Sequence, residues 1–101
     1  PIFVIGAERS GTTLLMTILG CHSRIAVPEV AWFYPRFYPY LQTYGDLSDR
    51  GHLRVLIEEM IFGLKTPFWG VQVNPKIIID DILERVLEPS FAGVYNAILQ
   101  W

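Results

Sequence analysis

Residues 2–19 read IFVIGAERSGTTLLMTIL, and the predicted fold depends on this stretch. Residues 2–5 are apolar and rich in β-branched types, which predicts a short, fully buried strand. Residues 6–11 predict a tight loop with a glycine at each end, where the backbone can take positive φ and approach a ligand closely. Residues 12–19 predict a helix, because their leucine and isoleucine side chains form one apolar stripe.

A strand, a glycine-bounded loop and a helix in this order are typical of an anion-binding site. The first N–H groups of a helix have no internal partner, and the helix dipole adds partial positive charge there. The glycines have the G-x-x-x-x-G spacing of a Walker A loop, but Thr12 and Thr13 stand where that motif needs Lys and then Ser or Thr. Arg9 is the one cation within the loop. The sequence therefore indicates a phosphate-binding loop whose cation, Arg9, precedes the second glycine instead of following it.

This segment resembles the 5′-phosphosulfate-binding loop of the sulfotransferases that use 3′-phosphoadenosine-5′-phosphosulfate (PAPS). The resemblance covers roughly residues 2–34 and includes His22 and the stretch 25–29. It implies PAPS as the sulfuryl donor and no metal. It also implies a set of donor-binding residues, of which Arg9 is additionally catalytic: Arg9, Ser10, Gly11, Thr12 and Thr13.

The acceptor needs a base, and Glu29 is the best carboxylate in the chain for that role. It follows a predicted second strand, residues 25–27, and open α/β sheets place their sites beyond the carboxyl ends of strands. The resemblance implies a catalytic carboxylate at Glu29 or one residue later. An equal alternative is that Glu29 lies near the start of a helix, where its negative charge interacts favourably with the helix dipole. His22 is expected to be remote from the loop, and Glu8 to point away from the anion.

The rest of the chain predicts helices. Residues 31–44 are rich in aromatic residues and interrupted by Pro35 and Pro39, which indicates broken helical turns. Amphipathic spacing predicts a helix over 53–64, preceded by Ser48 or Asp49 as a cap. Further helices are expected over 75–88 and 91–99, the first after an Asn-Pro cap and the second capped by Ser90.

The predicted fold class is thus α/β: a P-loop-like parallel sheet core with one βαβ unit, followed by helices. We expect a single partial domain over 1–101, with the donor-binding βαβ unit at 1–34 and a helical region at 35–101. Both ends look cut, and further strands, with the 3′-phosphate-binding Arg and Ser of the family, are expected after Trp101.

Some residues have an ordinary structural interpretation that we favour. We expect the aromatic segment to be part of the core. The less favoured alternative is that it lines an acceptor pocket and stacks on a sugar or phenol. The acidic residues of 80–88 are interpreted as a solvated face, Cys21 as a buried small hydrophobe, and His52 as a surface residue.

Composition excludes several classes. The net charge of −2 disfavours a nucleic-acid surface. The single cysteine forms no internal disulfide and no cysteine-based zinc site. No apolar run approaches the roughly 20 residues of a membrane span. The compartment stays open, with the cytoplasm slightly favoured, and so does the oligomeric state.

The function we infer is sulfuryl transfer from PAPS to an acceptor hydroxyl or amine, on a small molecule, carbohydrate or peptide. Two alternatives stay open. One is a divergent P-loop kinase or hydrolase, which Thr12 disfavours. The other is a non-catalytic remnant that binds a partner through its aromatic helices. The fragment itself is expected to hold only half of the donor site.

Overall fold

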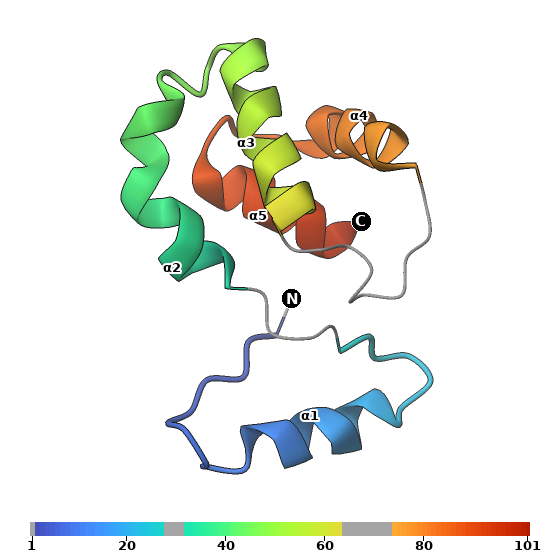
Figure 1. The fold of residues 1–101 in the computed structure, drawn as a ribbon. Coiled ribbons are helices and arrows are strands. Elements are labelled where there is room, and N and C mark those ends of the chain that lie inside the picture. The colour runs from blue at the N-terminus through green and yellow to red at the C-terminus, as the bar shows by residue number, and fades with distance from the viewer. Residues whose placement is uncertain (1, 28–31, 64–73) are drawn as a thin grey trace. The chain divides into compact units, whose positions relative to one another are not determined.

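The computed structural model describes residues 2–27, 32–63 and 74–101. They fall into two compact units, Pro1–Val30 and Ala31–Trp101. The described residues form five α-helices and one 3-10 helix, drawn in Figure 1. Among these helices, none combines the length with the apolar composition that crossing a membrane would need.

The first unit contains helix α1 (Thr12–Gly20) between segments without regular structure. The predicted parallel sheet is wrong for the described residues, since neither 2–5 nor 25–27 forms a strand (Figure 1). A strand requires a neighbour to complete its hydrogen-bond ladder, and these two segments make no backbone bonds to each other. The expected burial is also absent, because Ile2 and Ile5 are each 92% exposed. High β-propensity is not sufficient without a paired segment.

Helix α1 forms where the sequence predicts it but buries no residue. Leu14 and Ile18 of its apolar stripe are 65% and 59% exposed. Cys21, expected to be buried, is exposed at the C-terminal end of the helix. The described part of this unit is therefore organised by local hydrogen bonds rather than by a core.

The second unit is helical throughout its described residues. Its elements in order are α2 (Phe33–Phe37), the 3-10 helix η1 (Tyr38–Tyr44), α3 (Arg50–Gly63), α4 (Pro75–Arg85) and α5 (Phe91–Gln100). The predicted broken turns over the aromatic segment are confirmed as α2 and η1, with a proline near the start of η1. The helix expected over 75–88 ends earlier, because the backbone of Val86 is extended.

The core of this unit lies around α3, which packs against α4 and η1, while α5 packs against α4 (Figure 1). Phe33 joins α2 to α5 through an edge contact with Tyr95, at a ring separation of 5.0 Å. The described core residues are Phe33, Phe37, Leu53, Leu56, Ile57, Met60, Ile61, Ile78, Ile79, Ile82, Leu83, Phe91, Val94, Ala97 and Ile98.

Side-chain caps start the three long helices, as the sequence predicts. The Asp49 carboxylate accepts hydrogen bonds from the N–H groups of Gly51 and His52 at 2.8 and 3.1 Å, which holds the pKa of Asp49 below its usual value. The Asn74 side chain caps α4 and the Ser90 hydroxyl caps α5. Each cap satisfies donors that the helix itself leaves without a partner.

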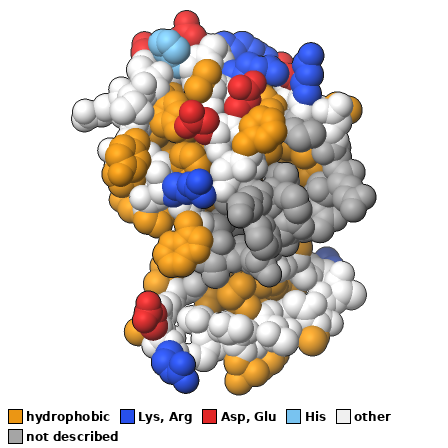
Figure 2. Space-filling view, viewed as in Figure 1, with side chains coloured by type: hydrophobic (Ala, Val, Ile, Leu, Met, Phe, Trp, Pro, Cys, Tyr) orange, Lys and Arg blue, Asp and Glu red, His pale blue; other side chains and the backbone are white. Residues whose placement is uncertain are grey.

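Two arginines of α3 connect it to α4. Arg54 donates to Asp80 at 2.6 Å and to Glu58 at 3.1 Å, which raises the pKa of Arg54 chiefly through the Asp80 bond. Arg50 pairs with Glu84. The acidic face of α4, expected to be merely solvated, thus partly faces cations. Figure 2 shows acidic and basic side chains next to one another on the viewed face, with apolar side chains also at the surface of both units.

Candidate functional site

The loop before α1 contains a tight turn. The N–H of Ser10 donates to the carbonyl of Ala7 at 3.2 Å, which closes a four-residue turn. Arg9 occupies its third position with φ of 61°, and among the described residues it is the one non-glycine residue with positive φ. Turns that need positive φ at this position normally use Gly or Asn there. An arginine instead stores strain, which is most often found at functional sites.

Gly11 begins the helix in the same left-handed region, with φ of 88° and ψ of 10°. The first helical bond joins the N–H of Leu15 to the carbonyl of Gly11 at 3.0 Å. The preceding N–H groups, of Thr12, Thr13 and Leu14, have no carbonyl within the helix to bind, and no side chain caps them. The starts of α3, α4 and α5 have side-chain caps, whereas the starts of α1 and the five-residue α2 have none. The uncapped start of α1 presents donors to an anion.

Gly6 supports the loop from the other end. A Cβ atom at this position would lie 2.5 Å from the Ser10 hydroxyl oxygen and 2.7 Å from the Thr12 methyl carbon. The side chains of Ser10 and Thr12 therefore lie directly over the Gly6 backbone. No atom within 4 Å of Gly11 would contact an added Cβ there. Gly6 thus leaves room for the side chains of Ser10 and Thr12, and Gly11 allows the positive φ that the backbone has before α1.

The predicted donor-binding residues are consecutive, and the loop brings two of them over Gly6. Arg9, Ser10 and Thr13 are exposed and Thr12 is partly buried. Arg9 forms no ion pair within residues 2–27, 32–63 and 74–101. A guanidinium with its donors available next to helix N–H groups can bind phosphate or sulfate oxygens in a bidentate manner.

Other sequence candidates lie apart from the loop or outside the described residues. Glu29 belongs to residues 28–31, which are outside the described ranges, so its role as a base stays a prediction. His22 follows α1 at the end opposite the loop, where its Nδ1 accepts from the N–H of Arg24 at 3.1 Å. Helix α1 thus lies between the loop and His22, as the sequence predicts.

The aromatic segment divides between core and surface. Phe33 and Phe37 are buried, as expected, but Tyr34 and Tyr40 are 59% and 62% exposed. Sequence reasoning missed that Arg36 of α2 and Glu59 of α3 lie near the exposed aromatic side chains, and no signal within either helix indicates that they come together.

Comparison with known proteins supplies one match. The family model described as "Sulfotransferase family" matches residues 1–95. No curated protein and no solved structure matches the chain. The match extends well past the residues on which the sequence resemblance depends.

Proposed function

Because the chain belongs to the sulfotransferase family, we propose that it uses PAPS as the sulfuryl donor and binds the 5′-phosphosulfate with residues 6–13. One observation carries this proposal: the start of α1 has no side-chain cap and follows a loop bent through two left-handed residues, Arg9 and Gly11. A capped helix would already have satisfied the N–H groups that an anion needs.

The residues present fit a phosphosulfate group. N–H groups of Thr12 and Thr13 would donate to its oxygens, and the Arg9 guanidinium would offset its charge. The absence of a Cβ at Gly11 leaves open space above the backbone. No lysine follows Gly11, so the loop lacks the group that a triphosphate site uses on its terminal phosphates.

In the proposed reaction the acceptor oxygen or nitrogen forms a bond to sulfur while the bond between sulfur and the bridging phosphate oxygen breaks. The leaving 3′,5′-diphosphoadenosine takes the electron pair of that bond, and the acceptor proton passes to a base. Arg9 and the helix N–H groups would stabilise the charge that develops on the bridging oxygen; one such donor is worth about 3 kcal/mol.

We keep Glu29 as the proposed base on the family resemblance of residues 2–34 alone, since residues 25–27 do not form the strand from which its position was predicted. Glu29→Gln is expected to abolish transfer while donor affinity stays within about twofold, since the amide keeps the shape and removes the proton acceptor. Glu8→Gln, at an exposed carboxylate of the loop, is the matched control. Equal activity in the two variants would assign the base elsewhere.

The deciding experiment is calorimetric titration of the full-length protein with 3′,5′-diphosphoadenosine, in EDTA and without Mg²⁺. Arg9→Ala is expected to weaken binding by about 10- to 150-fold, the equivalent of a charged hydrogen bond worth roughly 1.5–3 kcal/mol. Arg24→Ala is the control, since Arg24 is also exposed in the first unit but lies beyond α1. No binding, or equal loss in both variants, would refute the donor assignment.

The same titration separates the alternatives. A divergent kinase or hydrolase would bind ATP only with Mg²⁺ and prefer it to 3′,5′-diphosphoadenosine. A non-catalytic remnant would fold normally and respond to neither nucleotide.

A further inference from the structure

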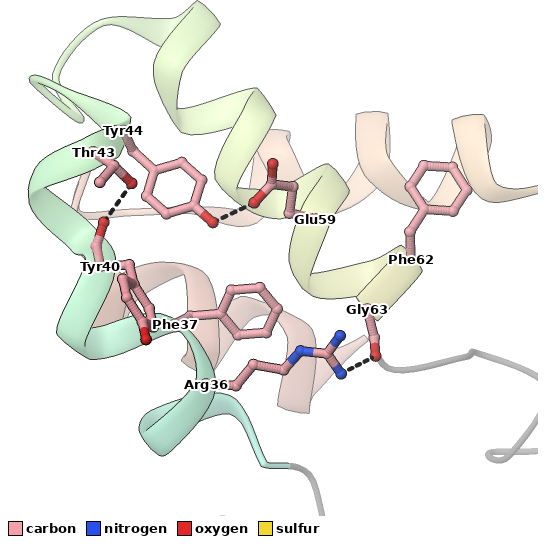
Figure 3. A pocket seen from close by; sticks show the side chains of 8 residues that line it. All are labelled: Arg36, Phe37, Tyr40, Thr43, Tyr44, Glu59, Phe62 and Gly63. Atoms are coloured by element: carbon pink, nitrogen blue, oxygen red, sulfur yellow. Dashed lines mark hydrogen bonds between the residues drawn. The ribbon is translucent and has the colours of Figure 1, made fainter.

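An open cavity of about 640 Å³ lies between α2, η1 and α3 in the second unit. Pockets for small molecules are typically of this size and combine apolar walls with a few convergent polar groups. This one has aromatic side chains from all three elements, together with one cation, Arg36, and one carboxylate, Glu59 (Figure 3). None of its lining residues belongs to the loop that we assign to the donor, and that assignment leaves it without a role.

Two hydrogen bonds cross the cavity and join its walls. The Tyr44 hydroxyl donates to Glu59 on α3, and Arg36 Nη1 donates to the carbonyl of Gly63 at 2.9 Å. Figure 3 shows the Phe37 ring lying between these two bonds. Each bond leaves capacity unused, since a guanidinium has five N–H donors and a carboxylate accepts at two oxygens. The cavity therefore has a donor group at one end and an acceptor group at the other.

The floor between the two ends is apolar and fixed. The Phe37 ring is 6% exposed, and the Arg36 guanidinium carbon lies 5.8 Å from its centroid. Gly63 makes this arrangement possible, because a Cβ there would lie 3.0 Å from the tip of the Phe37 ring. Tyr40 and Phe62 are 62% and 60% exposed and add aromatic surface at the rim.

The charges of the lining argue against an ionic ligand. Arg36 and Glu59 offset each other, so neither an anion nor a cation gains from the whole site. Burial and the Glu59 hydrogen bond raise the pKa of Tyr44 to about 12, so its hydroxyl is neutral at physiological pH. A neutral ligand that has one C–H face and hydroxyl groups around its edge matches the exposed aromatic rim and both polar ends. A sugar ring has this distribution.

We propose that the cavity between α2, η1 and α3 binds one neutral sugar ring. Its C–H face would lie on the exposed Tyr40 ring, and its hydroxyls would donate to Glu59 and accept from Arg36. The sugar would be the recognised unit of the acceptor, and this role depends on the sulfotransferase function proposed above. Sugar binding itself requires no nucleotide, so it is tested separately.

The test titrates the complete protein with methyl β-D-glucopyranoside and methyl β-D-galactopyranoside, observed by saturation-transfer NMR on the ligand and by shifts of the Thr43 methyl signal. At least one glycoside is expected to bind with Kd of about 1 mM, from roughly 0.3 kcal/mol per non-hydrogen atom. Tyr40→Ala is expected to weaken this at least about fivefold, the value of one aromatic contact. Tyr34→Ala is the matched control, with 59% exposure against 62% for Tyr40.

Glu59→Gln keeps an acceptor for the Tyr44 hydroxyl but removes the charge, and it is expected to weaken glycoside binding about threefold or more. Circular dichroism on each variant confirms that the helices remain. The proposal is overturned if neither glycoside binds up to about 20 mM, some 20 times the expected Kd. It is also overturned if p-cresol or choline binds more tightly, or if Tyr34→Ala weakens binding as much as Tyr40→Ala.

A parallel titration with 3′,5′-diphosphoadenosine distinguishes this proposal from the function above. If the nucleotide binds and the glycosides do not, the sugar assignment fails and the donor assignment stands. If the glycosides bind and the nucleotide does not, the sugar site stands and its role in sulfuryl transfer fails.

Discussion

The proposal that residues 6–13 bind the donor makes a quantitative prediction at Gly6. In Gly6→Ala the new methyl group would lie 2.5 Å from the Ser10 hydroxyl oxygen and 2.7 Å from the Thr12 methyl carbon. Ordinary contacts between such atoms are about 3.5–4.0 Å, so both side chains must move by roughly 1 Å. Both atoms are ends of side chains in a loop outside the core, so rotation of these side chains relieves the overlap at a cost of about 1 kcal/mol. Because Ser10 and Thr12 are proposed donor-binding residues, binding of 3′,5′-diphosphoadenosine should weaken about fivefold.

The assay is calorimetric titration of the full-length protein, with Gly20→Ala as the matched control. Gly20 is also in the first unit, but a Cβ there would lie 3.9 Å from the nearest atoms, both in Val27, an ordinary contact. Its affinity should stay within about twofold of the wild type. The reasoning is refuted if Gly6→Ala binds like the wild type, or if Gly20→Ala loses as much.

Gly11 separates backbone strain from steric overlap. An alanine at Gly11 would contact no atom within 4 Å, but it would have to adopt φ of 88°. The left-handed conformation costs about 1–2 kcal/mol for a residue with a Cβ, which predicts roughly 5- to 30-fold weaker nucleotide binding. Gly11→Asn should recover part of this loss, since Asn tolerates the left-handed region. Equal affinities for the alanine and asparagine variants would contradict the strain argument.

Three further predictions concern the helical unit. Ile57→Ala, at a fully buried core position, should lower the free energy of unfolding in urea by about 2–5 kcal/mol. Gly93→Ala would place its Cβ 2.0 Å from the backbone carbonyl oxygen of Glu88, and should lower the midpoint of thermal unfolding, at a cost of about 1–3 kcal/mol or more. The pKa of Tyr44 is raised from 10.0 to about 12 in the folded protein. The contribution of its hydroxyl to the free energy of unfolding is therefore complete below pH 10 and is lost as the pH rises through 12. Tyr44→Phe should therefore flatten the fall in stability over that window, followed by circular dichroism.

Each of these has a result that would contradict it. Val55 is 45% exposed on the same helix as Ile57, and Val55→Ala should change stability by no more than about 0.5 kcal/mol; equal losses would mean that α3 does not face the core as described. A Gly93→Ala variant as stable as the wild type would show that the first turn of α5 relaxes freely. An unchanged pH profile in Tyr44→Phe would assign the alkaline loss to other groups, of which Tyr95 is one, since burial raises its pKa as well.

Local signals predicted the helices well because each depends on neighbours in the sequence. The Asn74-Pro75 start of α4 and the Ser90 start of α5 are set by side chains that bond N–H groups two or three residues away. The i, i+4 pair of Arg54 and Glu58 is present for the same reason. Amphipathic spacing likewise identified the buried positions of α3.

Signals that depend on distant partners failed. The apolar run 2–5 has the composition of a strand, but a strand also requires a neighbour to complete its ladder, and none of the described residues provides one. The pairing of Arg54 with Asp80 and the cavity that includes Arg36 and Glu59 arise from packing between separate helices. A periodicity within one element contains no information on which side chains meet across two.

In the loop that we propose for the donor, the sequence predicted a tight turn between two glycines but not the backbone conformation of Arg9. Nothing in the letters Glu-Arg-Ser distinguishes an ordinary turn from one that holds an arginine at φ of 61°. Positive φ at Gly11 could be expected from the sequence, because glycine adopts it without steric cost.

The backbone of Arg9 has a consequence for directed evolution. Glycine or asparagine fits its φ of 61° better than arginine does. Screens that reward heat tolerance alone would therefore enrich exchanges at this codon, and each such exchange removes the guanidinium. Clones selected in that way should gain thermal stability and lose nucleotide binding together. Selection for turnover should instead retain arginine at this position.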